Sequence, residues 1–139
     1  MLAEICAFSD HQTAIIRLRE QVFIIEQGVP KVLEIDGLDP DCQHAVIFDG
    51  NSLVGTGRLT IDGKIGRIAV AATHRRRGLG SQLMAKLEQR AEDMGLSVVS
   101  ISAQVSALAF YQRLKYRQCG PIFVDAGIEH LPMTKVLKN

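Results

Sequence analysis

The chain has 139 residues, which is the length of one domain, so we expect a single domain over 1–139. Hydrophobic residues make up 47% and charged residues 22%, a balance that disfavours intrinsic disorder. The formal net charge is only +1, so the overall charge gives no reason to expect a nucleic acid or an anionic membrane as partner.

Cysteine and histidine usage disfavours disulfides and metal sites. The three cysteines, Cys6, Cys42 and Cys119, are odd in number and form no Cys-x-x-Cys pair. The four histidines lack the short paired spacings that are typical of zinc ligands. We see no secretory signal and no membrane span, and therefore expect a metal-free protein in a reducing compartment, the cytoplasm.

The N-terminal third predicts a strand, a helix and a long loop. Residues 2–8 are expected to form the first strand, and Ser9 and Gln12 have capping-box spacing at a helix start. Apolar residues then recur on one helical face: Ile15, Leu18, Val22 and Ile25. Gly28 ends this helix. Residues 31–43 are polar, acidic and turn-rich, and we expect a loop or irregular helix that takes part in function.

Apolar segments between turn signals predict three antiparallel strands in the middle of the chain. They cover 44–48, 53–61 and 64–70, with turns at 49–51 and at the Asp62–Gly63 hairpin signal. Gly66, inside the third strand, indicates a bulge or a close backbone approach.

The C-terminal half changes to helical periodicity after Gly78. A helix with the apolar face Leu83, Leu87, Ala91 and Met94 is expected to stop at Gly95. A short apolar strand over 96–103 should lie parallel to 64–70. A helix over 106–115 and strands over 122–124 and 131–136 follow. This order predicts an α/β fold of the α+β kind, with a mostly antiparallel sheet, a central parallel strand pair and flanking helices.

The segment from Arg75 to Ser81 has the features of an anion site. A strand is followed by three arginines, and Gly78 and Gly80 then open a helix whose first N–H groups lack helical partners. Arginines at a helix N-terminus oppose the helix dipole, and a bound phosphate or pyrophosphate removes that conflict. The alternative is a solvated basic loop in which the glycines serve only as turn residues.

These residues resemble the GCN5-related N-acetyltransferase family. Residues 75–80 match its Arg/Gln-x-x-Gly-x-Gly/Ala motif, 68–70 its fourth strand, and 107–111 its Ala-x-x-Phe-Tyr segment. Residues 22–30, the acidic segment and Gly127–His130 are similar to the ElaA/YjcF-like branch. Lys115–Tyr116 departs from the Gly-Phe that family members usually carry.

The resemblance implies a binding site for acetyl-coenzyme A as co-substrate. Pantetheine would lie between two diverging strands, along the backbone of Ile68, Ala69 and Val70. The pyrophosphate would meet the residues of the motif: Arg75, Arg76, Arg77, Gly78, Leu79, Gly80 and Ser81. Gln104, Phe110 and Tyr111 would complete the cofactor site.

The implied reaction is direct attack of a primary amine on the thioester in a ternary complex. Tyr111 would donate a proton to the departing thiolate, although a packed aromatic is the alternative. A base must also deprotonate the amine. Glu34 and His44 come ahead of Asp36 and Asp39, and each of these four is also explained by a structural role; His130, near the closing strands, ranks below them. Asp36 and Asp39, with Arg58, are expected near a cationic acceptor. The oligomeric state stays open, and a homodimer, which is common in the family, is one option.

Other functions remain open at this point. The acidic residues with Arg58 also resemble acyl-homoserine-lactone synthases, and a coenzyme A-binding regulatory module without turnover is a second alternative. A nucleic-acid patch at Arg75–Arg77 ranks last, because no aromatic residues interleave with the arginines.

Overall fold

The computed structural model describes residues 1–137, which form eight strands and four α-helices together with shorter helical segments. The N-terminal half contains β1 (Glu4–Ala7), α1 (Gln12–Arg19), the π-helical segment η2 (Glu20–Glu26), α2 (Lys31–Glu34), η3 (Asp39–Asp41), β2 (Gln43–Asp49), β3 (Ser52–Leu59) and β4 (Ile65–Val70). The C-terminal half contains η4 (Ala72–His74), α3 (Leu79–Asp93), β5 (Val98–Gln104), η5 (Val105–Ala107), α4 (Leu108–Arg113), β6 (Arg117–Gln118), β7 (Phe123–Asp125) and β8 (Ile128–Val136).

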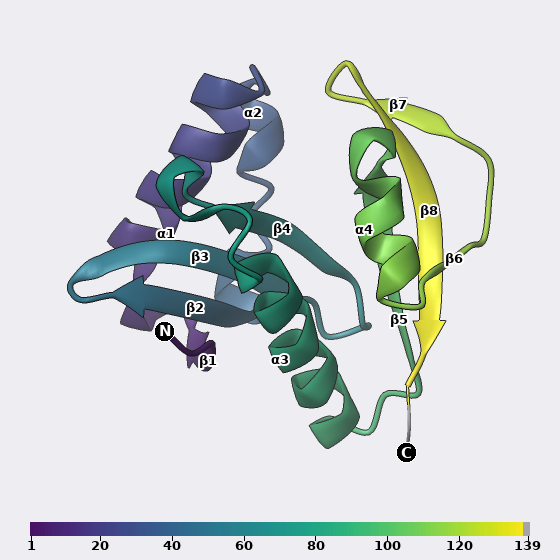
Figure 1. Cartoon of the computed structure of the whole chain (residues 1–139), viewed down its shortest axis with the longest axis horizontal. Helices are drawn as coiled ribbons and strands as arrows, with labels where there is room; N and C mark the ends of the chain where they lie inside the picture. The colour runs from purple at the N-terminus through teal and green to yellow at the C-terminus, as the bar shows by residue number, and fades with distance from the viewer. Residues whose placement is uncertain (138–139) are drawn as a thin grey trace.

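The strands form two antiparallel sheets that meet at one point (Figure 1). The first sheet has the order β1-β2-β3-β4 and the second β5-β8-β6, with β7 paired to β8. Lys64 and Ser100 form one parallel bridge between the start of β4 and the middle of β5, where the Ser100 N–H donates to the Gly63 carbonyl over 3.0 Å. The expected parallel pair is therefore a single contact, beyond which β4 and β5 diverge.

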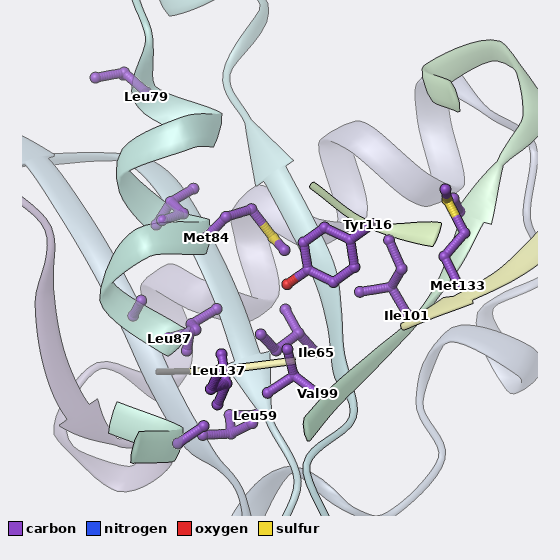
Figure 2. Close-up of a cluster of buried hydrophobic side chains, with 14 of the residues drawn as sticks. Leu59, Ile65, Leu79, Met84, Leu87, Val99, Ile101, Tyr116, Met133 and Leu137 are labelled. Atoms are coloured by element: carbon purple, nitrogen blue, oxygen red, sulfur yellow. The ribbon is translucent and has the colours of Figure 1, made fainter. Parts of the chain in front are cut away.

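Helices cover both faces of the first sheet (Figure 1). Leu18 and Val22 cluster with Ala69 on the side of α1, whereas α3 lies across the other face. Figure 2 shows the cluster beneath α3, where Met84 and Leu87 meet apolar side chains of both sheets. The sequence supplies this cluster through helical spacing in α3 and alternation in the strands.

Tyr116 joins the same cluster after the sharp turn that ends α4. Its hydroxyl donates to the Glu88 carboxylate over 2.7 Å, which satisfies a polar atom that would otherwise be buried without a partner. Lys115, just before it, has a φ of 76°. This left-handed conformation explains why the family usually carries glycine at that position.

β4 contains the irregularity that Gly66 indicated. Thr56 pairs with Ala69 but Arg58 pairs with Gly66, so Arg67 and Ile68 together oppose Gly57. Arg67 has a φ of 53°, and the bulge turns its side chain toward the second sheet and α2.

The N-terminal helix departs from the sequence expectation in two ways. The Ser9–Gln12 capping box is wrong, because the Asp10 carboxylate accepts from the Ala7 N–H over 2.9 Å and α1 begins later with no side-chain cap. Ile25 is exposed rather than on the buried face. The π-helical turns of η2 take more residues each than an α-helix, so the 3.6-residue period no longer holds there.

The C-terminal strands also differ in extent. β6 was not expected, and it pairs with β8 through Arg117–Thr134 and Gln118–Met133. β8 begins at Ile128, three positions earlier than predicted, and so includes His130. Across residues 1–137, no helix has the length and apolar character needed to cross a bilayer.

Candidate active site

A cleft of about 540 Å³ occupies the gap between β4 and β5. Ile68 and Val70 line one wall, and Ile101, Ser102 and Gln104 line the other. β4 is the edge strand of its sheet, so alternate peptide groups face the cleft and are available to an extended ligand. The volume suits a substantial ligand.

One end of the cleft meets the N-terminus of α3. Gly78 has a φ of 77° and occupies the N-cap without a side-chain cap, and the first helical bond runs from the Gln82 N–H to the Gly78 carbonyl. The N–H groups of Leu79, Gly80 and Ser81 precede that bond and have no helical acceptor. α3 is fifteen residues long, and its N-terminus has no side-chain cap. This is the kind of helix end at which the sequence predicted an anion site.

Gly80 lines the cleft where α3 meets α4. A Cβ at Gly80 would lie 3.3 Å from Cζ of Phe110, so the missing side chain also permits this close packing. The side chains of Leu79 and Ala69 are buried, so these two residues can face a ligand only through their backbone.

The three consecutive arginines differ in environment. Nε of Arg75 donates to the Val70 carbonyl over 3.0 Å, and its Nη2 pairs with the Glu26 carboxylate over 2.8 Å. Arg76 and Arg77 are exposed, and within residues 1–137 their side chains have no recorded ion pair. Arg75 thus ties η2 to β4, whereas Arg76 and Arg77 leave their charge available to a ligand.

Tyr111 lines the cleft from α4. Its ring meets Phe110 and Tyr116 edge to face, with centroids 5.0 and 6.0 Å away. Burial raises the pKa of the Tyr111 hydroxyl above its ordinary value, so the phenol stays protonated at neutral pH. Tyr116, the other tyrosine of the chain, is committed to Glu88 in the core. Tyr111 is therefore the tyrosine placed to donate a proton in the cleft.

A buried network contains the acidic segment. Arg19 is only 2% exposed; it donates from Nε to the Glu34 carboxylate and from Nη1 to Asp39 over 2.7 Å. Arg58 donates from Nη1 to Asp36 over 2.9 Å and to Asp39 over 3.0 Å. Three carboxylates thus meet two arginines, and Arg67 adds a third guanidinium.

Arg67 links this network to the cleft. Its Nη2 donates to the Glu34 carbonyl over 3.1 Å and to the Asp36 carboxylate over 3.3 Å, and it lines the cleft together with Glu34. The hydrogen bonds from Arg58 hold the pKa of Asp36 far below its usual range. The network therefore keeps its charges ionised in pairs.

The predicted acceptor and base residues separate in space. Glu34 lines the cleft, whereas Asp36, Asp39 and Arg58 lie behind it in the network. His44 is 1% exposed, its Nε2 lies 3.0 Å from the Asp39 carbonyl oxygen, and it does not line the cleft. Burial lowers the pKa of His44. A general base must reach the proton that it removes, so the geometry gives His44 a structural position.

Sequence reasoning missed several cleft residues. Asp125 and Ala126, from the turn between β7 and β8, line the cleft, as does Arg67. Gln27 also lines it, and its Oε1 accepts from Nε2 of Gln104 over 2.9 Å, which joins η2 to the end of β5. His130, the lowest-ranked base candidate from the sequence, is brought to this wall by the early start of β8. Recognising the two-residue turn at Ala126–Gly127 would have extended the last strand to include it.

Comparisons with known proteins identify the family of this chain. Residues 7–137 match the family model described as an acetyltransferase (GNAT) domain. The "Uncharacterized N-acetyltransferase YjcF" of Bacillus subtilis is 43% identical over 122 residues, which cover 85% of this chain and 87% of that protein.

Solved structures agree over nearly the whole length. An acyl-CoA N-acyltransferase from Pseudomonas aeruginosa is 29% identical with a TM-score of 0.87, covering 97% of this chain and 99% of the other. Escherichia coli ElaA is 27% identical with a TM-score of 0.86, also covering 97% and 99%. The two sheets that splay apart at β4 and β5, the bare N-terminus of α3 and these matches lead to one conclusion: the chain belongs to the GCN5-related N-acetyltransferase (GNAT) family of acyltransferases.

Proposed function

We propose that this acyltransferase moves the acetyl group of acetyl-coenzyme A to a primary amine by direct attack in a ternary complex. The observation that carries the proposal is the continuous cleft that runs from the bare N-terminus of α3, between β4 and β5, to Tyr111. A diphosphate, an extended amide chain and a thioester need these features in this order.

The chain's own groups fit coenzyme A at both ends. The free N–H groups of residues 79–81 suit the pyrophosphate, with Arg76 and Arg77 adding charge beside them. The edge of β4 at Ile68 and Val70 suits the amides of pantetheine, which can pair as an added strand. Gln104 would contact the cofactor after its side-chain hydrogen bond to Gln27 breaks.

The chemistry then balances with the residues present. The amine nitrogen forms a bond to the thioester carbonyl carbon and releases its surplus proton to a base or to water, and the carbon–sulfur bond breaks. The departing thiolate takes the proton of the Tyr111 hydroxyl, which burial keeps protonated. Tyr111 recovers its proton from the solvent after the products leave.

The buried network supports the acceptor side in this proposal. Arg19, Asp39 and Arg58 fix α2 and the bulge of β4, so that Glu34 and Arg67 form a wall of constant shape. Asp36 and Asp39 act through this wall rather than by touching the acceptor. The cleft is complete within one chain, and a homodimer stays a prediction.

The decisive experiment combines coenzyme A titration with an acetyl-coenzyme A thiol-release screen over many primary amines. We expect binding and amine-dependent thiol release by the wild type. Tyr111→Phe should lower kcat by about 10²-fold or more while leaving the Kd for acetyl-coenzyme A nearly unchanged. Tyr116→Phe is the matched control, because it removes a hydroxyl from the core and should affect stability rather than kcat.

The outcomes separate the alternatives. Absence of coenzyme A binding would refute the proposal. Binding without thiol release across the amine panel would identify a regulatory module. Release only with S-adenosylmethionine and an acyl carrier protein would identify an acyl-homoserine-lactone synthase.

A further inference from the structure

His130 faces the cleft from the start of β8. It pairs with Gln104 of β5 on one side and with Phe123 of β7 on the other. Within residues 1–137 it is the histidine that lines the cleft, since His44 is buried in the network and His74 pairs with Asp49. The exposed His11 contacts Phe48 elsewhere on the surface.

The contacts of the His130 ring define its tautomer. Nδ1 lies 2.8 Å from the carbonyl oxygen of Ile128. A carbonyl oxygen only accepts, so Nδ1 carries the hydrogen and, in the neutral ring, Nε2 keeps its lone pair. The ring stacks on Phe123 with centroids 5.5 Å apart and planes 19° apart, which holds its orientation. No partner for Nε2 is recorded in the described part of the chain.

The charged groups of the same cleft have other roles. They are Glu26, Lys64, Arg75, Glu34, Arg67 and Asp125. Glu26 pairs with Arg75, and Glu34 is held by Arg19, with Arg67 at 3.8 Å. Asp125 is exposed at the turn and has no ion pair among residues 1–137. It is thus available to attract a cationic amine.

We propose that Nε2 of His130 is the general base that removes a proton from the acceptor ammonium, directly or through one water molecule. This inference rests on the proposed function and deepens it. The nitrogen–hydrogen bond of the ammonium breaks, its proton passes to Nε2, and the freed nitrogen lone pair attacks the thioester carbonyl. His130 leaves the step as an imidazolium in the cleft that Asp125 also lines, and later releases its proton to water. The acylated nitrogen gives its remaining surplus proton to water as the carbon–sulfur bond breaks, and Tyr111 protonates the departing thiolate.

The test compares His130→Gln with wild type in the full chain, using two primary amines as probes. Butylamine is protonated at neutral pH, whereas trifluoroethylamine is already neutral and needs no base before attack. The variant should lose about 10²–10³-fold in kcat/KM with butylamine and remain within a few fold of wild type with trifluoroethylamine. His11→Gln is the matched control and should behave like wild type with both amines.

The pH dependence supplies a second readout. With butylamine, log kcat/KM of the wild type should be level across neutral and mildly alkaline pH, because the enzyme itself removes the ammonium proton. The variant can use only the fraction of butylamine that is already deprotonated in solution. Its log kcat/KM should therefore rise by about one unit per pH unit over the same range. A merely structural histidine would not change this slope.

Each failure has a distinct signature. Normal coenzyme A binding with wild-type butylamine rates in His130→Gln would overturn this inference and leave the proposed function standing. Equal losses with both amines would show a structural role and also overturn it. Absence of coenzyme A binding by the wild type would overturn both. If the variant does not fold, nitrogen NMR of histidine in the wild type still decides, because a hydrogen on Nε2 in the neutral ring contradicts the proposal.

Discussion

Arg19 is the residue whose removal should reveal the energy of the buried network. Arg19→Met keeps the length of the side chain but leaves the Glu34 and Asp39 carboxylates without their main partner. Breaking a buried ion pair from one side costs about 3–5 kcal/mol. Arg58 still binds Asp39 over 3.0 Å and Arg67 lies 3.8 Å from Glu34, so we expect the lower end, about 3 kcal/mol.

The assay is urea unfolding followed by circular dichroism, with thermal unfolding beside it. A loss of about 3 kcal/mol is a large share of the roughly 5–15 kcal/mol that stabilise a domain. It should lower Tm by on the order of 10 °C in a chain of this length. Arg17→Met is the matched control: Arg17 is exposed on the same helix, so its replacement should change stability by about 0.5 kcal/mol or less.

The pH dependence of this loss follows from Asp39. Burial alone would raise the pKa of Asp39, but the hydrogen bonds and charges of Arg19 and Arg58 outweigh it and lower the pKa. A carboxyl with a lowered folded pKa stabilises the fold above its unfolded pKa, about 3.9, and that stabilisation is lost as the pH falls through the folded value. The difference between wild type and Arg19→Met should therefore be largest near neutral pH and shrink as the pH falls below about 4. A loss no larger than that of Arg17→Met, or one that grows on acidification, would refute the reasoning.

Three further predictions concern backbone and thiol positions. Gly57→Ala would place a Cβ 2.5 Å from Cδ1 of Ile68, so we expect a loss of about 1–3 kcal/mol by urea unfolding and a higher Kd for coenzyme A as Ile68 is displaced; unchanged values would argue against the close approach. Lys115→Gly should raise stability by roughly 0.5–1 kcal/mol, because glycine adopts a φ of 76° without strain, and a lower Tm would contradict this. Burial, with Asp10 and Glu4 nearby, raises the pKa of Cys6 to about 11. Native protein at neutral pH should therefore be alkylated first at the exposed Cys119, which peptide mass spectrometry can measure. Equal alkylation rates at Cys6 and Cys119 would contradict this prediction.

Most elements of the fold could be predicted because their patterns are local. The apolar face of α3 follows helical spacing, and the strands β2 to β4 alternate between turns that carry their own signals. The exceptions arise where local and tertiary preferences compete. The π-helical turns of η2 exposed Ile25, and β6 is too short to show any periodicity.

The helix start at which the cofactor is predicted to bind could be located in the sequence for the same reason. The motif 75–81 is contiguous, and a strand followed by glycines at a helix start specifies exposed N–H groups without knowledge of the rest of the fold. The acceptor side is different, because it joins α2, the bulge of β4 and the β7–β8 turn from distant parts of the chain. His44 and Asp39 illustrate the difficulty: their residue types suit catalysis, but burial and pairing gave them structural positions.

The sequence by itself determined the order of the elements, the uncapped helix start after Gly78 and the tyrosine that lines the cleft, since each depends on neighbouring residues. Only the tertiary structure decided which charged side chains form ion pairs and which side chains lie together in the cleft. The physical reason is that pairing and burial depend on contacts between residues far apart in the chain. Arg19 with Asp39 and His130 beside Gln104 are such contacts, and no local pattern encodes them.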